Sequence, residues 1–156
     1  RKDKRKWRGG KREEGNRKNR GLQLRDVRQG QPYDVAAAGG DLDNARMMTP
    51  DGLREVAGYA DAIGPDVGAV MPWAGNGGLG RPTRLVRDAH AAGLEVHPYT
   101  FRPENRFLAK DFWQGDDPFT LNQAGLVAQI GAYLDAGIDA LFTDDPASGR
   151  KAVDAR

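Results

Sequence analysis

Polar side chains that could do chemistry follow two short apolar runs of this sequence, at the points where buried strands would end. His97 and Tyr99 stand at the end of the first run, and Asp144 and Asp145 directly follow the second. Imidazole and carboxylate groups are common general acids and bases in enzymes, and carboxylates also bind divalent cations. The segments that follow these two runs are therefore the first places to look for a functional site.

The elements around these residues predict a parallel α/β fold. Each apolar run, 94–100 and 138–142, follows a helical pattern that ends in Ala-Gly. A helix, a glycine stop, a buried strand and a polar loop in this order are typical of parallel sheets with helical crossovers. In such folds the loops after the C-terminal ends of the strands hold the functional residues.

The other expected elements alternate in the same way. Thr49-Pro50 has the pattern of a helix start, and Gly64-Pro65 the pattern of a stop. The expected elements are a helix over 53–63, a strand over 67–71, a helix over 82–92, a strand over 94–100, a long aromatic loop over 101–121, a helix over 122–136, a strand over 138–142 and a short helix after Pro146. About three parallel strands are too few to close a barrel, so we expect part of a larger fold.

Three further candidates receive a structural interpretation. The glycine-rich segment 75–78 lacks the Lys-Ser/Thr pair of a P-loop, and a plain flexible loop is the favoured interpretation. His90 lies in a helix away from any strand end, which favours a structural or solvent role. Glu104 is interpreted as a solvated loop residue rather than a ligand.

Charge is distributed unevenly along the chain. Residues 1–30 contain 13 Lys and Arg against 4 Asp and Glu, whereas the whole chain has a formal net charge of only +2. We expect residues 1–30 to form a disordered basic tail and residues 31–150 to form the domain. Such a tail could bind nucleic acid or another polyanion, or it could simply be solvated. The chain has no cysteine, which excludes disulfides and thiolate zinc sites.

Four motifs in the right order resemble the glycerophosphodiester phosphodiesterase family, and more narrowly its bacterial periplasmic type. His97-Pro98-Tyr99-Thr100 and the segment from Gly137 to Phe142-Thr143-Asp144-Asp145-Pro146 resemble the last two barrel strands of that family. The helix that runs into Gly64-Pro65-Asp66 and the aromatic, acidic insertion over 101–121 are also similar. The resemblance covers roughly residues 32–150.

The resemblance implies a (β/α)₈ TIM barrel that hydrolyses glycerophosphodiesters to glycerol 3-phosphate and an alcohol, as part of glycerophospholipid metabolism. It also implies a divalent cation, Ca²⁺ or Mg²⁺, and a periplasmic or secreted location. The family's catalytic histidines and cation-holding carboxylates belong to its N-terminal half, and their motifs are absent here. We therefore expect the C-terminal portion only, with no catalytic and no metal-binding residue in this chain, no activity of the chain alone, and a missing N-terminal half-barrel as its partner.

The resemblance assigns one substrate contact directly, because it places an aromatic residue of the strand 94–100 beside the glycerol moiety, and this residue maps onto Tyr99. Phe142, near the end of the last strand, is a second expected wall residue. His97 is expected to pack in the barrel interior, and Asp144 and Asp145 to shape their loop. Two alternatives remain open, a polyanion-binding protein acting through its basic tail and an inactive half-barrel scaffold.

Overall fold

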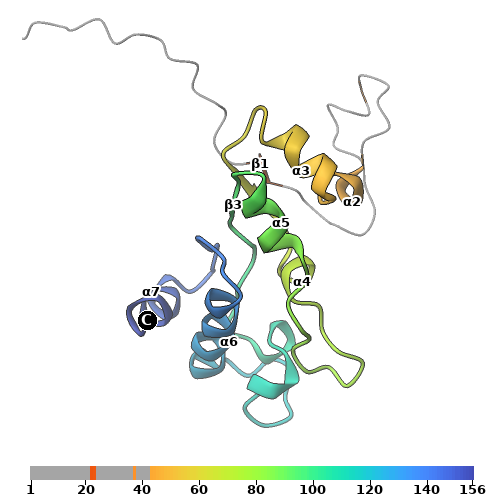
Figure 1. The fold of residues 1–156 in the computed structure, drawn as a ribbon. Coiled ribbons are helices and arrows are strands. Elements are labelled where there is room, and N and C mark those ends of the chain that lie inside the picture. The colour runs from red at the N-terminus through yellow and green to blue at the C-terminus, as the bar shows by residue number, and fades with distance from the viewer. Residues whose placement is uncertain (1–21, 24–36, 38–42) are drawn as a thin grey trace, which may run out of the picture.

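The computed structural model describes residues 22–23, 37 and 43–156 and contains a small parallel sheet. The strands are β1 (Leu22–Gln23), β2 (Ala62–Gly64) and β3 (Glu95–Val96), in the order β1-β2-β3 and all parallel. The helices are α2 (Asn44–Met47), α3 (Pro50–Val56), α4 (Val67–Val70), α5 (Leu85–Ala91), α6 (Gln123–Asp135) and α7 (Pro146–Asp154), with the 3₁₀ turns η1 (Asn105–Phe107) and η2 (Lys110–Phe112). The sheet lies near α3 and α5, and α6 and α7 lie toward the other end of the described chain (Figure 1). The predicted α/β class with parallel strands is confirmed.

The segment 138–143 extends the sheet beyond β3 without forming a regular strand. The amide of Asp139 donates to the Val96 carbonyl at 3.1 Å, and the amide of Phe142 donates to the Pro98 carbonyl at 3.0 Å. The amide of Phe101 in turn donates to the Phe142 carbonyl at 2.9 Å, next to a parallel bridge between Phe101 and Thr143. The segment predicted as a strand over 138–142 thus lies in the expected place, and its pairing is irregular.

Three of the expected helices begin with a side-chain cap, and the one at Thr49 is the cap that the sequence indicates. The side chains of Thr49, Asn122 and Asp145 each accept a hydrogen bond from the backbone N–H three residues later, at 3.2, 2.8 and 3.0 Å. These bonds satisfy amides that have no partner inside the helix. The predicted helices over 122–136 and after Pro146 are confirmed as α6 and α7, and the predicted role of Asp145 in shaping its loop is seen in its cap.

The helix predicted over 53–63 is wrong in its second half. It ends at Val56, and Ala62–Gly64 forms the central strand β2 instead. The turn after the helix is closed by amides of Gly58 and Tyr59 that donate to carbonyls three residues earlier, and glycine at position 58 disfavours further helix. Residues 62–64 are buried, which fits a strand with neighbours on both sides better than one face of a helix.

The strand predicted over 67–71 is also wrong, because this segment forms the short helix α4. The carboxylate of Asp66 accepts a hydrogen bond from the Gly68 amide at 2.7 Å and caps the helix. The amide of Val67 makes the last sheet-like bond, 2.9 Å to the Tyr99 carbonyl, and the chain then turns into the helix. The cap outweighs the strand preference of two valines, as local context often does.

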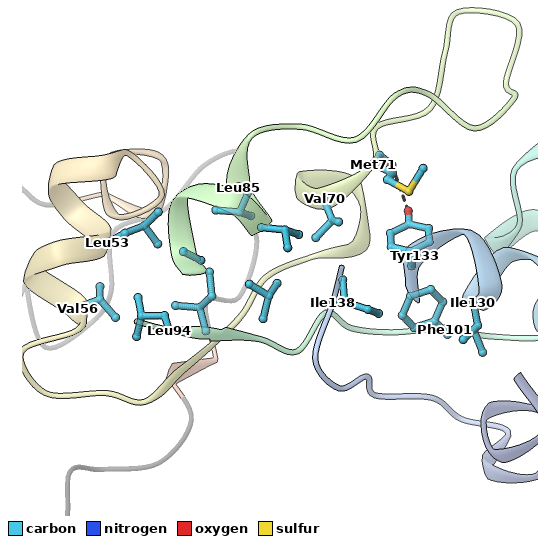
Figure 2. Packing of buried hydrophobic residues seen from close by; sticks show 14 of the residues in the cluster. Leu53, Val56, Val70, Met71, Leu85, Leu94, Phe101, Ile130, Tyr133 and Ile138 are labelled. Carbon is cyan, nitrogen blue, oxygen red and sulfur yellow. Dashed lines mark hydrogen bonds between the residues drawn. The ribbon is translucent and has the colours of Figure 1, made fainter. Parts of the chain in front are cut away.

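The hydrophobic core runs in one continuous cluster from α3, past α5, to α6 (Figure 2). At its α6 end the ring of Phe101 meets Tyr133 edge to face, with centroids 5.0 Å apart and an interplanar angle of 87°. The Tyr133 hydroxyl donates to the carbonyl oxygens of Met71 and Val67, at 3.1 and 3.2 Å. Tyr133 therefore connects α6 to both ends of α4.

The range 1–30, predicted as a disordered basic tail, is described only at Leu22 and Gln23. These two residues form β1, which corrects the prediction at that point. The rest of the range lies outside the described residues, and so do the Lys and Arg residues on which the polyanion-binding alternative depends. Among the described helices, none combines the length and the apolar composition needed to cross a bilayer.

Candidate functional site

A cavity of about 720 Å³ opens where β2 and β3 end. Asp66 follows β2 by two residues and Tyr99 follows β3 by three, and a parallel bridge joins these two residues. The cavity is lined by Asp66, Val67, Gly68, Trp73, Tyr99, Thr100, Arg102 and Phe107. Its volume suits a small molecule, and its position at the C-terminal edge of a parallel sheet is the usual position of a site in α/β folds.

The backbone ladder fixes the two sides of the cavity wall. The amide of Tyr99 donates to the Pro65 carbonyl at 3.0 Å, and the Tyr99 carbonyl accepts from Val67 at 2.9 Å. The sheet therefore continues past the ends of β2 and β3 up to the cavity. Tyr99 is half-buried in this wall, as expected for a residue that contacts a ligand from a rigid element.

Arg102 is the basic residue of the wall, and two carboxylates neutralise it. Its Nη2 donates to Glu104 Oε1 at 2.9 Å, and its Nε lies 3.1 Å from Asp144 Oδ2. The Nε atom is buried and makes no well-directed hydrogen bond, so the contact with Asp144 is an ion pair only. The guanidinium also stacks 4.3 Å from the centroid of Phe107.

This cluster corrects one prediction and extends another. Glu104, predicted as a solvated loop residue, keeps only 17% of its side chain exposed because it accepts from Arg102 and faces Arg106 at 3.8 Å. Asp144 does more than shape its loop, since its ion pair joins the segment 138–144 to the chain that follows β3. The two carboxylates hold the Arg102 side chain at the cavity rim.

The glycine-rich segment 75–78 is a fixed turn rather than a plain flexible loop. The Gly77 carbonyl accepts from the Lys110 amide at 2.9 Å, and Asp111 Oδ2 accepts from the Leu79 amide at 2.6 Å. Gly77 has a φ of +83°, a conformation that glycine adopts without strain. An antiparallel bridge between Trp73 and Leu79 closes the turn, so this segment positions Trp73 in the cavity wall.

The other predicted residues lie away from the cavity. Phe142 is 43% exposed, and its side chain is not part of the cavity lining, so its contact with a substrate stays a prediction. His97 does not pack in the interior, because its Nε2 pairs with Glu95 Oε2 at 2.9 Å near the surface. His90 Nε2 lies 2.8 Å from Asp139 Oδ2, which also accepts from the Val96 amide at 2.8 Å.

That last contact gives His90 the structural role expected for it. The same carboxylate oxygen receives the His90 ring and the backbone of β3, and thus connects α5 to the segment 138–143. A pair that ties α5, β3 and the segment 138–143 together outside the cavity lining stabilises the fold rather than a site.

The comparison with known proteins decides the family. Residues 16–148 match the sequence model of the glycerophosphoryl diester phosphodiesterase family. The chain belongs to this family. The match covers most of the chain and begins inside the range 1–30 that the sequence assigned to a tail.

A plant member of the family is similar over much of this chain. Glycerophosphodiester phosphodiesterase GDPD6 of Arabidopsis thaliana is 36% identical over 115 residues, which cover 66% of this chain and 28% of the plant protein. The chain therefore spans less than a third of the length of this relative.

The divalent cation implied by the family resemblance does not fit the described residues. Within residues 43–156 and the few described before them, no three His, Asp or Glu side chains come together in a way that could hold an ion. The cavity wall contributes one carboxylate, that of Asp66. We therefore derive no chemical step through a cation from these residues.

The family resemblance assigned Tyr99 to the substrate, and the structure places Tyr99 in the cavity wall, so its contact with a substrate stays a prediction. The sequence did not point to the other residues of the wall. Asp66 was hidden because residues 53–63 were predicted as one helix, so no strand end was expected before it. Arg102 had a usable signal, since it lies within a few residues of the end of the predicted strand 94–100, and the rule that loops after strands hold the site would have selected it. Trp73 follows α4, a helix that was wrongly predicted as a strand, so it had no such signal.

Proposed function

We propose that residues 31–150 belong to the C-terminal part of the (β/α)₈ barrel of a glycerophosphodiester phosphodiesterase. The proposed reaction converts a glycerophosphodiester into glycerol 3-phosphate and the free alcohol of the head group. The single observation that carries the proposal is the cavity at the ends of β2 and β3, with Tyr99 in its wall, in a chain of this family. The name of the plant relative supports the same activity.

The order of the parallel segments supports a barrel rather than an open doubly wound sheet. β1, β2, β3 and the segment 138–143 lie side by side in the order in which they occur in the chain. A doubly wound sheet reverses its strand order at a switch point, whereas a barrel keeps adding neighbours in one direction. No reversal occurs among the described strands.

In this proposal the chain binds and orients the substrate. Water adds to phosphorus, the ester bond to the head-group oxygen breaks, and that oxygen takes a proton to leave as the alcohol. Tyr99 lies beside the glycerol moiety, and Phe142 is kept as a second wall residue. The groups that move the proton and the ligands of the Ca²⁺ or Mg²⁺ ion are assigned to parts of the protein outside the described residues.

The proposal is tested by following glycerol 3-phosphate released from glycerophosphocholine in the presence of Ca²⁺ or Mg²⁺. The longest open reading frame that encodes residues 1–156 is compared with the 156-residue chain alone. We expect turnover by the longer protein and none by the chain alone. Absence of turnover by the longer protein with any glycerophosphodiester would overturn the activity, and turnover by the chain alone would overturn the assignment of the catalytic groups to another part.

We also propose the bacterial periplasmic subtype and a periplasmic or secreted location. The support is the similarity of the segment 96–100, Val-His-Pro-Tyr-Thr, to that subtype. Fractionation of bacteria that express the full reading frame, followed by immunoblotting, tests the location. Recovery of the protein with cytoplasmic markers would contradict it.

A further inference from the structure

The cavity wall has a chemical bias that the family does not specify. We infer that it selects glycerophosphodiesters whose head group is a cationic alcohol, with an ammonium group held between the Asp66 carboxylate and the face of Trp73. This inference rests on the proposed function, because it assigns the head group of the proposed substrate. Tyr99 keeps its place beside the glycerol moiety.

Asp66 is the unbalanced charge of the wall. One of its carboxylate oxygens accepts from the Gly68 amide at 2.7 Å, and the ion pairs among the described residues do not include it. The basic residue of the same wall, Arg102, is paired with Glu104 at 2.9 Å and with Asp144 at 3.1 Å. The positive charge is thus compensated locally, whereas Asp66 lines the cavity without a basic partner among the described residues. Together with burial, which is the larger cause, its carboxylate also raises the pKa of the Tyr133 hydroxyl.

Trp73 supplies the aromatic face for such a cation. It lines the cavity and is 46% exposed. The fixed turn over 75–78 and the backbone pairs on either side of it hold Trp73 in place. Among the described residues, no guanidinium or ammonium lies over its ring. Phe107 is different, because Arg102 and Arg106 stack on it at 4.3 and 4.8 Å from its centroid.

This pairing of a carboxylate with an indole favours a cation over the other head groups of glycerophosphodiesters. Tryptophan binds cations on its face more strongly than the other aromatic residues do, and quaternary ammonium groups are the usual ligands of such surfaces. A neutral polyol could donate hydrogen bonds to Asp66 but would gain no charge attraction. An anionic head group would meet the Asp66 carboxylate at close range and be disfavoured.

The test measures binding of choline to the 156-residue chain by ligand-observed NMR. The matched control is the neutral isostere in which a tert-butyl group replaces the trimethylammonium group. Because the two ligands have nearly the same shape, their difference reports the charge. We expect choline to bind about tenfold more tightly than the isostere. Equal affinities would overturn the inference.

Two pairs of variants assign the binding to the cavity. Asp66→Asn keeps the acceptor for the Gly68 amide and removes the charge, so we expect choline affinity to fall about tenfold and isostere affinity to stay the same. The control Asp61→Asn removes an exposed carboxylate away from the cavity and should change neither. Trp73→Leu should weaken choline binding about threefold, and Phe119→Leu, an exposed aromatic outside the cavity, should not.

The outcomes separate this inference from the diesterase proposal, because binding is measured without turnover. Choline binding that depends on Asp66, in a longer protein with no diesterase activity, would support the inference and overturn the proposed function. Turnover of glycerophosphocholine and glycerophosphoglycerol at equal kcat/KM, with no effect of Asp66→Asn on their ratio, would overturn the inference and leave the diesterase activity standing.

Discussion

Asp66 and Tyr99 are backbone partners across the C-terminal ends of β2 and β3. The amide that follows Asp66 donates to the Tyr99 carbonyl at 2.9 Å, and the Tyr99 amide donates to the carbonyl that precedes Asp66 at 3.0 Å. The two walls of the cavity are therefore held by the sheet ladder and not by a free loop. A change that loosens this ladder is expected to affect the cavity and the fold together.

At Gly52, helix propensity and packing predict opposite effects of a substitution by alanine on the free energy of unfolding. Gly52 lies in the first turn of α3, where alanine is intrinsically more favourable than glycine by up to about 1 kcal/mol. A Cβ atom at this position, however, would lie 2.7 Å from the Met47 Cα and would overlap the Arg46 carbonyl oxygen. We expect Gly52→Ala to lower the free energy of unfolding by about 1–3 kcal/mol, measured by urea denaturation.

Gly75→Ala is the control, because no heavy atom lies within 4 Å of its added Cβ. We expect its free energy of unfolding to stay within about 1 kcal/mol of the wild type. A Gly52→Ala protein as stable as the wild type would show that α2 and α3 do not pack as closely as described.

The loop over 101–121 is predicted to depend on the buried amide of Asn105. This side chain is fully buried, and its Nδ2 donates to the carbonyls of Gln114 and Asp117, both at 2.9 Å. Asn105→Ala would leave two inward-facing carbonyls without that donor, so we expect a loss of about 2–3 kcal/mol in the free energy of unfolding.

Asn76→Ala tests whether the effect comes from burial. The Asn76 side chain makes one local bond, to the Gly78 amide at 2.9 Å, on an exposed turn. Its replacement is expected to cost about 1 kcal/mol or less, because water can replace the lost acceptor. Similar losses for Asn105→Ala and Asn76→Ala would contradict the inference that burial of the Asn105 amide is what stabilises the loop over 101–121.

The elements that could be predicted from the sequence are those with strong local signals. The Thr49-Pro50 pattern located the start of α3, and apolar periodicity located α6. The short strand β2 could not be found in this way, because Ala60 and Ile63 also continue the helical spacing of Leu53 and Val56. Three buried residues can be assigned to a helix or a strand only when their neighbours in space are known.

The dependence on neighbours in space also explains which residues of the candidate site the sequence did not indicate. Tyr99 was singled out because it lies in the predicted strand 94–100 and maps onto an aromatic residue of the family, whereas Asp66 follows a strand that the sequence did not reveal. The interaction of Arg102 with Asp144 joins residues 42 positions apart, and no pattern along the chain indicates which carboxylate an arginine will meet. Long-range ion pairs of this kind depend on the fold, not on local spacing.

Phe101 is predicted to hold α6 against the rest of the core. Its ring is 1% exposed and meets Tyr133 edge to face at 5.0 Å. Phe101→Leu keeps most of the volume but loses the aromatic edge contact and leaves a small cavity, so we expect a loss of about 1–3 kcal/mol in the free energy of unfolding. Phe119→Leu, at a ring that is 65% exposed, should change it by less than about 1 kcal/mol. Equal effects of the two variants would show that Phe101 is not part of the core.

Tyr133 predicts a loss of stability in alkaline solution. Burial, and secondarily the negative charge of Asp66, raises the pKa of its hydroxyl above the ordinary value of 10. Above about pH 10 the unfolded chain therefore releases this proton while the folded chain retains it, so the free energy of unfolding falls as pH rises. Below that pH both states are protonated, and the hydroxyl stabilises the fold through its bonds to Met71 and Val67.

Comparison with Tyr133→Phe isolates this contribution, because the other titrating groups cancel in the difference. At pH 8 we expect the variant to be less stable by about 1–2 kcal/mol, since two buried carbonyls lose their donor. Phenylalanine does not ionise, so only the wild type loses stability above pH 10. The difference in free energy of unfolding between the two proteins should therefore decrease by about 1.4 kcal/mol at pH 11, one unit above the pKa of a tyrosine in the unfolded chain. Urea denaturation of both proteins at several pH values from 8 to 11 measures this difference in free energy of unfolding. A difference that stays constant over this range would mean that the Tyr133 hydroxyl ionises as readily in the folded chain as in the unfolded one, and that it is not buried against α4.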